Sequence, residues 1–272
     1  MPLKSRATNS PPIGVFDSGA GGLSIVAAIR NALPAQSIMY YADTAFAPYG
    51  PRSDQEILAR THFCCSLLLE RGVAALVVAC NTATANAIDE LRSWAPVPVI
   101  GVEPGLKPAA SATRNGVVGV LATRATLSSR RYRELLRRVS EQSPDVRFVE
   151  HAAHGWVELV ESGELESAHA RGLVRQAVRA LTDEGADTLV LGCTHYPFLR
   201  KAIEAAAGPA VIIETGPAIA RELQRRLPHA PPTAASSEAE LLQFDASGDR
   251  DRFAALAATL LAVTGTEHES AG

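Results

Sequence analysis

The sequence contains few cysteines, little net charge and no long apolar segment, and each of these shortages excludes a class of protein. Four cysteines in 272 residues are too few for a disulfide scaffold, so each must be a core residue, a metal ligand or a reacting group. A net charge of −3 provides no basic excess with which to bind nucleic acid.

The chain also lacks the segments that direct a protein to a membrane or through one. Residues 1–12 contain no apolar signal-peptide core, and no run approaches the roughly 18 apolar residues of a membrane span. We therefore expect no membrane association and a cytoplasmic location, in which the thiols stay reduced.

The sequence contains two successive sets of apolar runs, and the runs in each set are separated by helical patterns. The first set of predicted strands is Ile13–Asp17, Ser37–Asp43, Val73–Ala79 and Val97–Val102. The second set is Gly116–Leu121, Val146–Glu150, Ala186–Gly192 and Ala210–Glu214. Nearly continuous apolar strands separated by helices are typical of parallel sheets covered on both faces. The sequence therefore predicts an α/β fold of two pseudo-symmetric, doubly wound, flavodoxin-like lobes with an active site in the cleft between them.

The last part of the chain decides how the lobes are divided. Residues 238–247 and 250–263 read as a strand and a helix, which we assign to the first sheet because the second set is already complete. Lobe one then comprises residues 13–103 and 214–264, and lobe two comprises residues 104–213, with long helices at Leu127–Ser140 and Glu166–Glu184. Residues 1–12 and 265–272 are expected to be flexible ends, and Pro228–Ser237 a surface loop.

Two similar stretches end in cysteine, one in each half of the chain. Ala75–Thr82 contains Cys80 and Thr188–His195 contains Cys193, each in the third strand-to-helix turn of its set. Ligands bind at the carboxyl ends of the strands in open parallel sheets. We therefore expect a shared cleft lined by Asp17–Ser18, Cys80–Thr82, Thr123–Thr126 and Cys193–His195.

The two thiols suggest acid and base chemistry. Each cysteine precedes what we predict to be the first turn of a helix, whose positive end favours a thiolate. One ionised and one protonated thiol on opposite sides of a carbon could remove a proton from one face and deliver one to the other, as a racemase requires. Asp17, Glu161 and His195 are the titratable groups best placed to assist. The sequence makes no obvious provision for a metal or pyridoxal phosphate.

Several of these features also have simpler structural interpretations. Cys64 and Cys65 read as core residues, and Asp17 could serve as a helix cap. Turn geometry is expected to be the main role of the glycines in the Asp17–Gly22 turn. His151 and His154 have a helical ligand spacing but no third ligand nearby, so we expect no metal site there. A solvated face is the simplest interpretation of the arginines at positions 130, 131, 133, 137 and 138.

Four longer motifs occur in a specific order. They are Phe16-Asp17-Ser18-Gly19-Ala20-Gly21-Gly22-Leu23-Ser24, Pro48-Tyr49-Gly50, Ala79-Cys80-Asn81-Thr82-Ala83 and Leu191-Gly192-Cys193-Thr194-His195-Tyr196-Pro197. Together they resemble the signature motifs of bacterial glutamate racemases. The resemblance implies a cofactor-independent isomerase that interconverts L- and D-glutamate, supplies D-glutamate for peptidoglycan and forms a homodimer.

The resemblance also implies roles for individual residues. Cys80 would act on the D-enantiomer with support from Asp17, and Cys193 on the L-enantiomer with support from His195 and Glu161. The family's Cys-Pro pair is replaced here by Ala153-His154, so Glu161 is aligned only on Leu159-Val160-Glu161 and Gly163. The implied substrate-binding positions are Asp17, Ser18, Tyr49, Gly50, Asn81, Thr82, Thr194 and His195.

Three alternatives stay open at this point. A dinucleotide-binding fold would explain the glycine turn and Asp43 at the end of the second strand, but its motif requires Gly or Ala where Ser24 stands. A two-lobed protein that only binds a small acid would have no use for two thiols at strand ends. An aspartate racemase, or a related member of the same superfamily, would share the chemistry and differ in substrate length.

Overall fold

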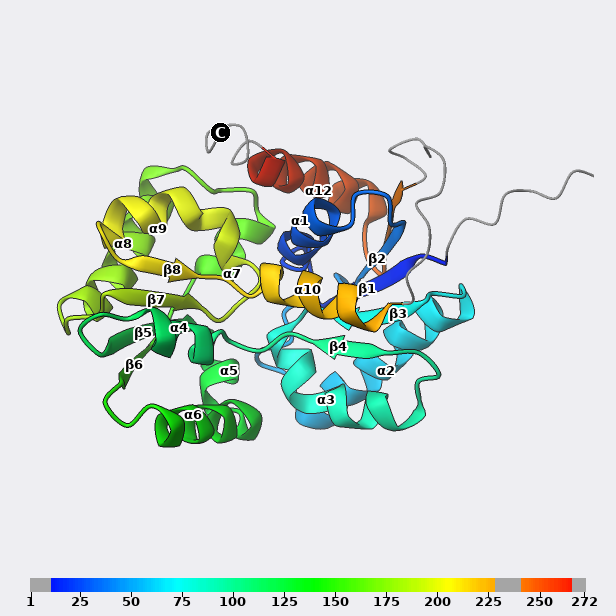
Figure 1. Ribbon diagram of the computed structural model, residues 1–272. Coiled ribbons are helices and arrows are strands. Elements are labelled where there is room, and N and C mark those ends of the chain that lie inside the picture. Colours follow the sequence, from blue (N-terminus) through cyan, green and yellow to red (C-terminus); the bar gives the residue numbers. More distant parts are fainter. Residues whose placement is uncertain (1–10, 228–240, 266–272) are drawn as a thin grey trace, which may run out of the picture.

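Two parallel β-sheets lie side by side in the computed structural model, which describes residues 11–227 and 241–265 (Figure 1). The first sheet has the strand order β4-β3-β1-β2-β9, with bounds Val99–Gly101, Ala75–Val78, Ile13–Asp17, Ile38–Ala42 and Leu242–Ala246. The second has the order β6-β5-β7-β8, with bounds Arg147–Ala152, Val117–Ala122, Thr188–Leu191 and Val211–Ile213. Every strand pair is parallel, which confirms the predicted fold class.

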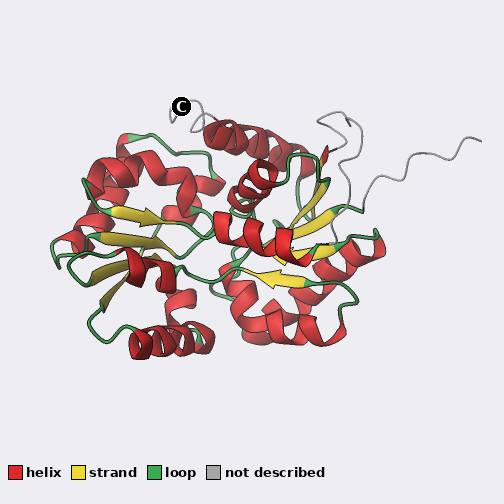
Figure 2. Ribbon diagram, in the orientation of Figure 1, coloured by secondary structure: helices red, strands yellow, loops and turns green. Residues whose placement is uncertain are grey.

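Helices cover both faces of each sheet (Figure 2). Around the first sheet they are α1 (Leu23–Ala32), α2 (Asp54–Glu70), α3 (Asn81–Trp94), α10 (Gly216–Arg226) and α12 (Arg250–Gly265). Around the second they are α4 (Leu106–Ala112), α5 (Arg124–Ser128), α6 (Arg130–Gln142), α7 (Trp156–Glu161), α8 (Ala168–Thr182), the 3₁₀ helix η1 (Tyr196–Leu199) and α9 (Arg200–Ala207). Among the described residues, no helix is long and apolar enough to cross a membrane.

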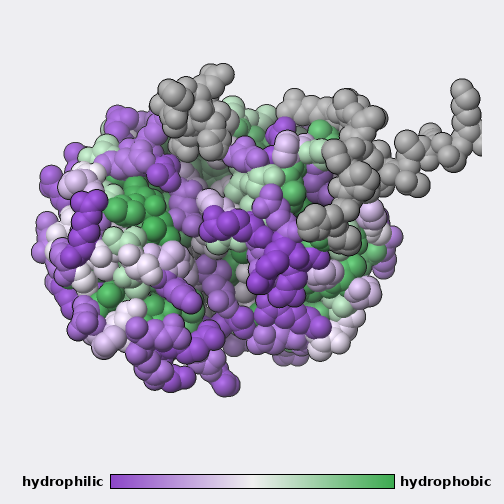
Figure 3. Space-filling model, in the orientation of Figure 1, coloured by the Kyte–Doolittle hydropathy of each residue, from purple (hydrophilic) through white to green (hydrophobic). Residues whose placement is uncertain are grey.

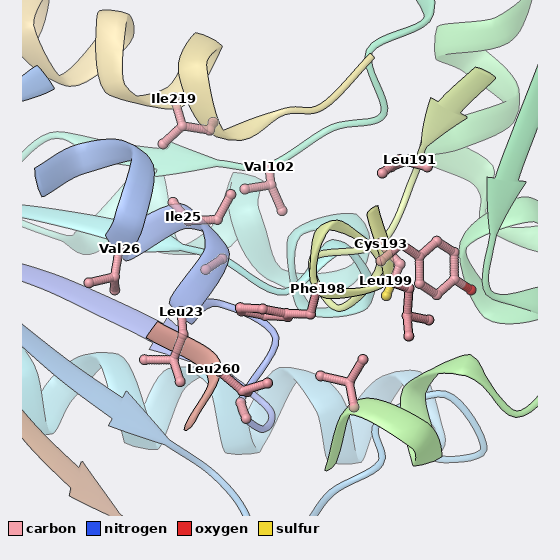
Figure 4. Packing of buried hydrophobic residues seen from close by; sticks show 14 of the residues in the cluster. Leu23, Ile25, Val26, Val102, Leu191, Cys193, Phe198, Leu199, Ile219 and Leu260 are labelled. Atoms are coloured by element: carbon pink, nitrogen blue, oxygen red, sulfur yellow. The ribbon is translucent and has the colours of Figure 1, made fainter. Parts of the chain in front are cut away.

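Alternate residues of β1 point into different cores because side chains on a strand alternate between its faces. Ile13 and Val15 join a cluster with α1, whereas Phe16 joins the cluster under α2 and α3. The first of these clusters continues into the second lobe, where Leu23 of α1 lies near Phe198 of η1 (Figure 4). This continuous apolar contact presses the glycine turn after β1 against the turn that carries Cys193.

The long helix expected at Leu127–Ser140 is in fact two helices. Ser129 has an extended backbone, and its side chain accepts a hydrogen bond from the Tyr132 N–H, so it ends α5 and caps α6. Two short helices, α4 and α7, were not predicted at all. The predicted loop at Pro228–Ser237 lies outside the described residues, as do most residues of the two predicted flexible ends.

The arginine-rich helix α6 lies in a strongly hydrophilic part of the surface (Figure 3). Arg130 and Arg137 are exposed and pair with glutamates on the same helix, as a solvated face predicts. Arg131 differs, because it bonds Glu103 at 2.7 Å and Asp89 at 3.1 Å, and Asp89 lies on α3 of the first lobe. One residue of the supposed solvated face therefore links helices from the two lobes.

Candidate active site

A cavity of about 430 Å³ lies at the carboxyl ends of strands from both sheets. Its walls include most of the residues expected in the shared cleft, and the cavity is lined by Ser18, Cys80, Asn81, Thr82, Thr123, Thr126, Cys193, Thr194 and His195. Pro48, Tyr49 and Gly50 contribute from the loop after β2. Asp17 does not line the cavity, because its side chain is completely buried behind it.

Cys80 caps the amino end of α3, as its position in the sequence predicts. Its Sγ accepts a hydrogen bond from the Ala83 N–H at 3.4 Å and lies 3.5 Å from Ser18 Oγ. Burial is the main reason why the pKa of the Cys80 thiol rises to about 11, although hydrogen bonds from Ser18 and Ala83 act in the opposite direction. The helix terminus therefore does not ionise this thiol, and Cys80 is protonated at neutral pH.

Cys193 has a different environment, and the helix expected immediately after it is absent. The 3₁₀ helix η1 begins only at Tyr196, where Pro197 fits the first turn, so the thiol lacks a helix terminus beside it. Its neighbour is instead His195, whose Nδ1 lies 3.6 Å from Sγ. The other ring nitrogen, Nε2, lies 2.7 Å from Glu161 Oε1. The structure thus aligns a thiol, an imidazole and a carboxylate in a row.

The charge of this row follows from its hydrogen bonds. Burial lowers the pKa of His195, but the hydrogen bonds to Cys193 and Glu161 outweigh burial and hold that pKa well above its usual value. Burial raises the pKa of Glu161. The hydrogen bond and the electrostatic attraction to His195 outweigh burial and hold the pKa of Glu161 below its usual value. His195 is therefore an imidazolium held by a carboxylate, and it can stabilise a thiolate at Cys193.

Asp17 belongs to the contact between the lobes more than to Cys80. Its Oδ1 accepts the Gly19 N–H at 2.7 Å, and its Oδ2 accepts the hydroxyl of Thr194 from lobe two at 3.3 Å. Burial raises the pKa of Asp17 to about 6, against the attraction of the His195 charge. The Asp17 carboxyl group can therefore titrate near neutral pH, and it does so behind the cavity wall.

The glycines of this turn have a different role from the one expected. Gly19, Gly21 and Gly22 have no positive φ, so turn geometry does not require them. A Cβ at Gly19 would overlap the Glu161 carboxylate, and one at Gly21 would overlap the His195 ring and lie 2.7 Å from the Thr194 hydroxyl. Gly19 and Gly21 are therefore needed because the two lobes approach each other closely there, whereas a Cβ at Gly22 would meet Asp17, Ala79 and Tyr40 of its own lobe.

The cavity loop after β2 is fixed by a buried ion pair that the sequence did not reveal. Arg60 binds Asp43 through two hydrogen bonds of 2.9 and 2.7 Å, and the Tyr49 hydroxyl donates to the same carboxylate at 2.6 Å. The Arg60 guanidinium also lies 3.7 Å from the centre of the Phe46 ring. Asp43 is therefore fully engaged, which argues against a ribose-binding role, and only the polar spacing on α2 hinted at Arg60.

Arg124 lines the cavity as part of the expected Thr123–Thr126 segment, whereas the titratable side chains of His154 and Glu158 were not predicted there. His151 lies on strand β6 and not on a helix, so its spacing from His154 is not helical. Among residues 11–227 and 241–265, no three His, Cys, Asp or Glu side chains are placed to share a metal ion. Cys64 and Cys65 are buried in α2, where burial raises the pKa of both thiols, as expected for core residues.

The sequence is similar to those of known proteins over most of its length. The family model for Asp/Glu/Hydantoin racemase matches residues 13–223. The chain is 48% identical to a glutamate racemase from Herpetosiphon aurantiacus over 244 residues, covering 89% of this chain and 95% of the relative. It is 52% identical to one from Methylococcus capsulatus over 220 residues, covering 80% of each protein.

Solved structures give the same result. The structure of a glutamate racemase isoform from Bacillus anthracis matches with a TM-score of 0.81 and 34% identity, covering 94% of this chain and 95% of that one. The Escherichia coli glutamate racemase, in complex with L-glutamate and the activator UDP-MurNAc-ala, matches with a TM-score of 0.79 and 33% identity, covering 94% and 95%. The chain therefore belongs to the Asp/Glu/Hydantoin racemase family.

Proposed function

We propose that this protein interconverts L- and D-glutamate by two proton transfers at the α-carbon, without a cofactor. The observation that carries the proposal is the pair of buried thiols, Cys80 and Cys193, that line one cavity from opposite lobes. A racemase must act on both faces of a carbon, and this arrangement supplies one acid or base for each face. The names and structures of the relatives described above support glutamate as the substrate.

In the L-to-D direction Cys193 is the base. Its thiolate, stabilised by the His195 imidazolium, takes the α-proton, and the electron pair of the broken C–H bond spreads into the substrate carboxylate. The Cys80 thiol then gives its proton to the opposite face of the same carbon, which forms the new C–H bond and leaves a thiolate at Cys80. In the reverse reaction the two thiols exchange roles. In both directions Asp17 and Ser18 support Cys80, and Glu161 supports His195 on the Cys193 side.

Hydrogen bonds must hold the substrate and stabilise the carbanion, because no cofactor delocalises its charge in this proposal. Asn81 supports substrate binding, since its Oδ1 is buried, has no hydrogen-bond partner among the described residues and can accept a hydrogen bond from the substrate ammonium group. It lies at the cavity wall with Thr82, whose hydroxyl can donate to a carboxylate, and with Thr194, whose hydroxyl donates to Asp17. We also assign Tyr49 and Gly50 to substrate binding. They would bind through their backbone, because the Tyr49 hydroxyl already donates to Asp43.

The direct test is to incubate the purified protein with each glutamate enantiomer, and with each aspartate enantiomer in parallel, and to follow optical rotation. We expect glutamate to lose its rotation from either side and aspartate to react far more slowly. Unchanged rotation of glutamate would contradict the proposal. Faster loss with aspartate would support the aspartate racemase alternative.

Three further parts of the proposal come from the family resemblance: a role in supplying D-glutamate for peptidoglycan, a cytoplasmic location and a homodimer. Expression of the chain in a bacterial strain that requires D-glutamate should restore growth without the supplement. Light scattering on the purified protein should give twice the chain mass of 28.7 kDa. A strain that still requires the supplement, or a monomer at all concentrations, would contradict the corresponding part.

A further inference from the structure

Ser24 has no place in the reaction described above, although it lies beside the turn that carries Cys193. It is the second residue of α1, at the position where a dinucleotide-binding motif would carry Gly or Ala. Its side chain is buried, and it does not line the catalytic cavity. A buried hydroxyl that never meets the substrate must have another function, or a structural role alone.

The Ser24 hydroxyl connects the two lobes. Its Oγ lies 2.7 Å from the carbonyl oxygen of Thr194 and 2.9 Å from that of Gly21. A hydroxyl has one proton to donate, and the nearer carbonyl, 170 positions away in lobe two, is the better acceptor. That carbonyl belongs to the peptide between Thr194 and His195, directly after Cys193.

Other groups of lobe one contact the same region, but they act on side chains. Asp17 accepts the Thr194 hydroxyl, and the Ala20 N–H donates to Glu161 at 2.8 Å. Ser24 instead binds the backbone of the turn, which determines where the Cys193 and His195 side chains begin. Cys80 is independent of this contact, because its partners Ser18 and Ala83 both belong to its own lobe.

We propose that Ser24 is a positioning residue for Cys193, whose hydroxyl fixes the Thr194–His195 peptide against lobe one and so sets the distance from this thiol to the substrate. The proposal rests on the two-thiol function given above. It predicts an asymmetric defect: without the Ser24 hydroxyl, proton transfer to and from Cys193 is slowed, whereas transfer at Cys80 is not.

Isotope effects can separate the two transfers because each enantiomer gives its α-hydrogen to a different thiol. Slowing the Cys193 transfer makes that step more fully rate-limiting. The deuterium isotope effect on kcat/KM should then rise for [2-²H]-L-glutamate, whose deuteron goes to Cys193. It should fall towards one for [2-²H]-D-glutamate, whose deuteron goes to Cys80.

The experiment compares Ser24→Ala with the native protein and with Thr61→Val as a control. Thr61 is also a buried helical hydroxyl, but it donates within α2 to the carbonyl of Ile57. We expect kcat/KM of Ser24→Ala to fall about 10-fold. The fall should be equal in both directions, because the enantiomers have equal free energies. The isotope effect should rise for L-glutamate and fall for D-glutamate. Thr61→Val should keep the native isotope effects.

A lower rate with both isotope effects unchanged would overturn the proposal, since that result describes a protein that is only less well folded. If Ser24→Ala does not fold, Ser24→Cys replaces it, because a thiol has nearly the same shape and is a weaker donor. The same divergence is then expected, and its absence overturns the proposal. If the native protein fails to racemise glutamate, the proposed function itself has failed.

Discussion

Cys80 and Cys193 are equally buried, but only Cys193 has a titratable side chain as a direct partner. The His195 imidazolium lies beside the Cys193 thiol, while burial keeps Cys80 protonated. In the proposed reaction one thiol must be ionised and the other protonated, so the two enantiomers require opposite protonation states of this pair.

The two thiols should be individually essential. We expect Cys80→Ser and Cys193→Ser each to lower kcat at least about 1,000-fold in both directions, because a serine hydroxyl is a far weaker acid and base than a thiol. Cys65→Ala is the matched control, since Cys65 is buried in α2 away from the cavity, and it should keep native kcat. A Ser variant with native activity, measured by optical rotation, would remove the mechanism.

Asp17 should make the stability of the fold depend on pH. Burial raises its pKa from 3.8 to about 6, so the folded protein binds a proton more tightly there than the unfolded chain does. Stability must then fall as pH rises from about 4 to about 6, by about 3 kcal/mol from this group alone. Asp17→Asn should therefore be more stable than the native protein at pH 8 and no more stable at pH 4, while losing activity.

Urea unfolding at the two pH values measures this difference. Asp145→Asn provides the control, because Asp145 is an exposed residue of the turn before β6 and the variant keeps Asp17, so its stability should follow that of the native protein at both pH values. Lower stability of Asp17→Asn at pH 8 would show that the Asp17 charge is a net stabilising feature, contrary to its burial.

The glycine turn after β1 is the element that lets the lobes meet. Gly21→Ala places a methyl group where the His195 ring lies, so we expect kcat to fall at least about 100-fold through displacement of the catalytic turn. Gly172→Ala is the control, because its added Cβ in α8 would meet nothing within 4 Å. That variant should gain about 1 kcal/mol of stability and keep its activity. Near-native kcat in Gly21→Ala would show that this close approach is not needed.

Helix α2 should fix the cavity loop through Arg60. Replacing Arg60 with Met leaves the fully buried Asp43 carboxylate without its cation, which we expect to cost about 3 to 5 kcal/mol in urea unfolding. The cost should be accompanied by a raised KM, because Tyr49 shares the same carboxylate. Arg130→Met, which breaks an exposed pair on α6, should change stability far less. Equal losses in the two variants would contradict the structural importance of the buried pair.

The strand ends could be predicted from the sequence, whereas the contacts between the lobes could not. Strand ends were predictable because apolar runs stop at polar residues, and this placed both cysteines at strand ends that face one cavity, with Asp17 at a neighbouring strand end. The close approach at Gly21 and the Ser24 contact depend on how one lobe packs on the other, which no local pattern encodes. The break at Ser129 was missed because a serine within a helical pattern is also a good cap. Arg60 looked like any polar residue on α2.

At the scale of the whole molecule, the reaction requires two lobes that meet in one arrangement. Several contacts join residues of the two sheets or of their covering helices. They are the apolar core that runs from α1 to η1, the Asp17–Thr194 and Ala20–Glu161 hydrogen bonds, and the Arg131 contacts. Each thiol is rigidly held in its own lobe. Their alignment across the substrate therefore depends on the contact between the lobes.

The central claim is that two thiols act on opposite faces of one carbon, and hydrogen exchange in D₂O tests it most directly. Each glutamate enantiomer is incubated with the protein to low conversion, and the hydrogen at Cα is determined by mass spectrometry in the product and in the remaining substrate. The account predicts product that carries deuterium at Cα from either starting enantiomer, with little deuterium in the remaining substrate. Product that retains its original hydrogen would mean that one group moves the same proton between faces, and would contradict the account.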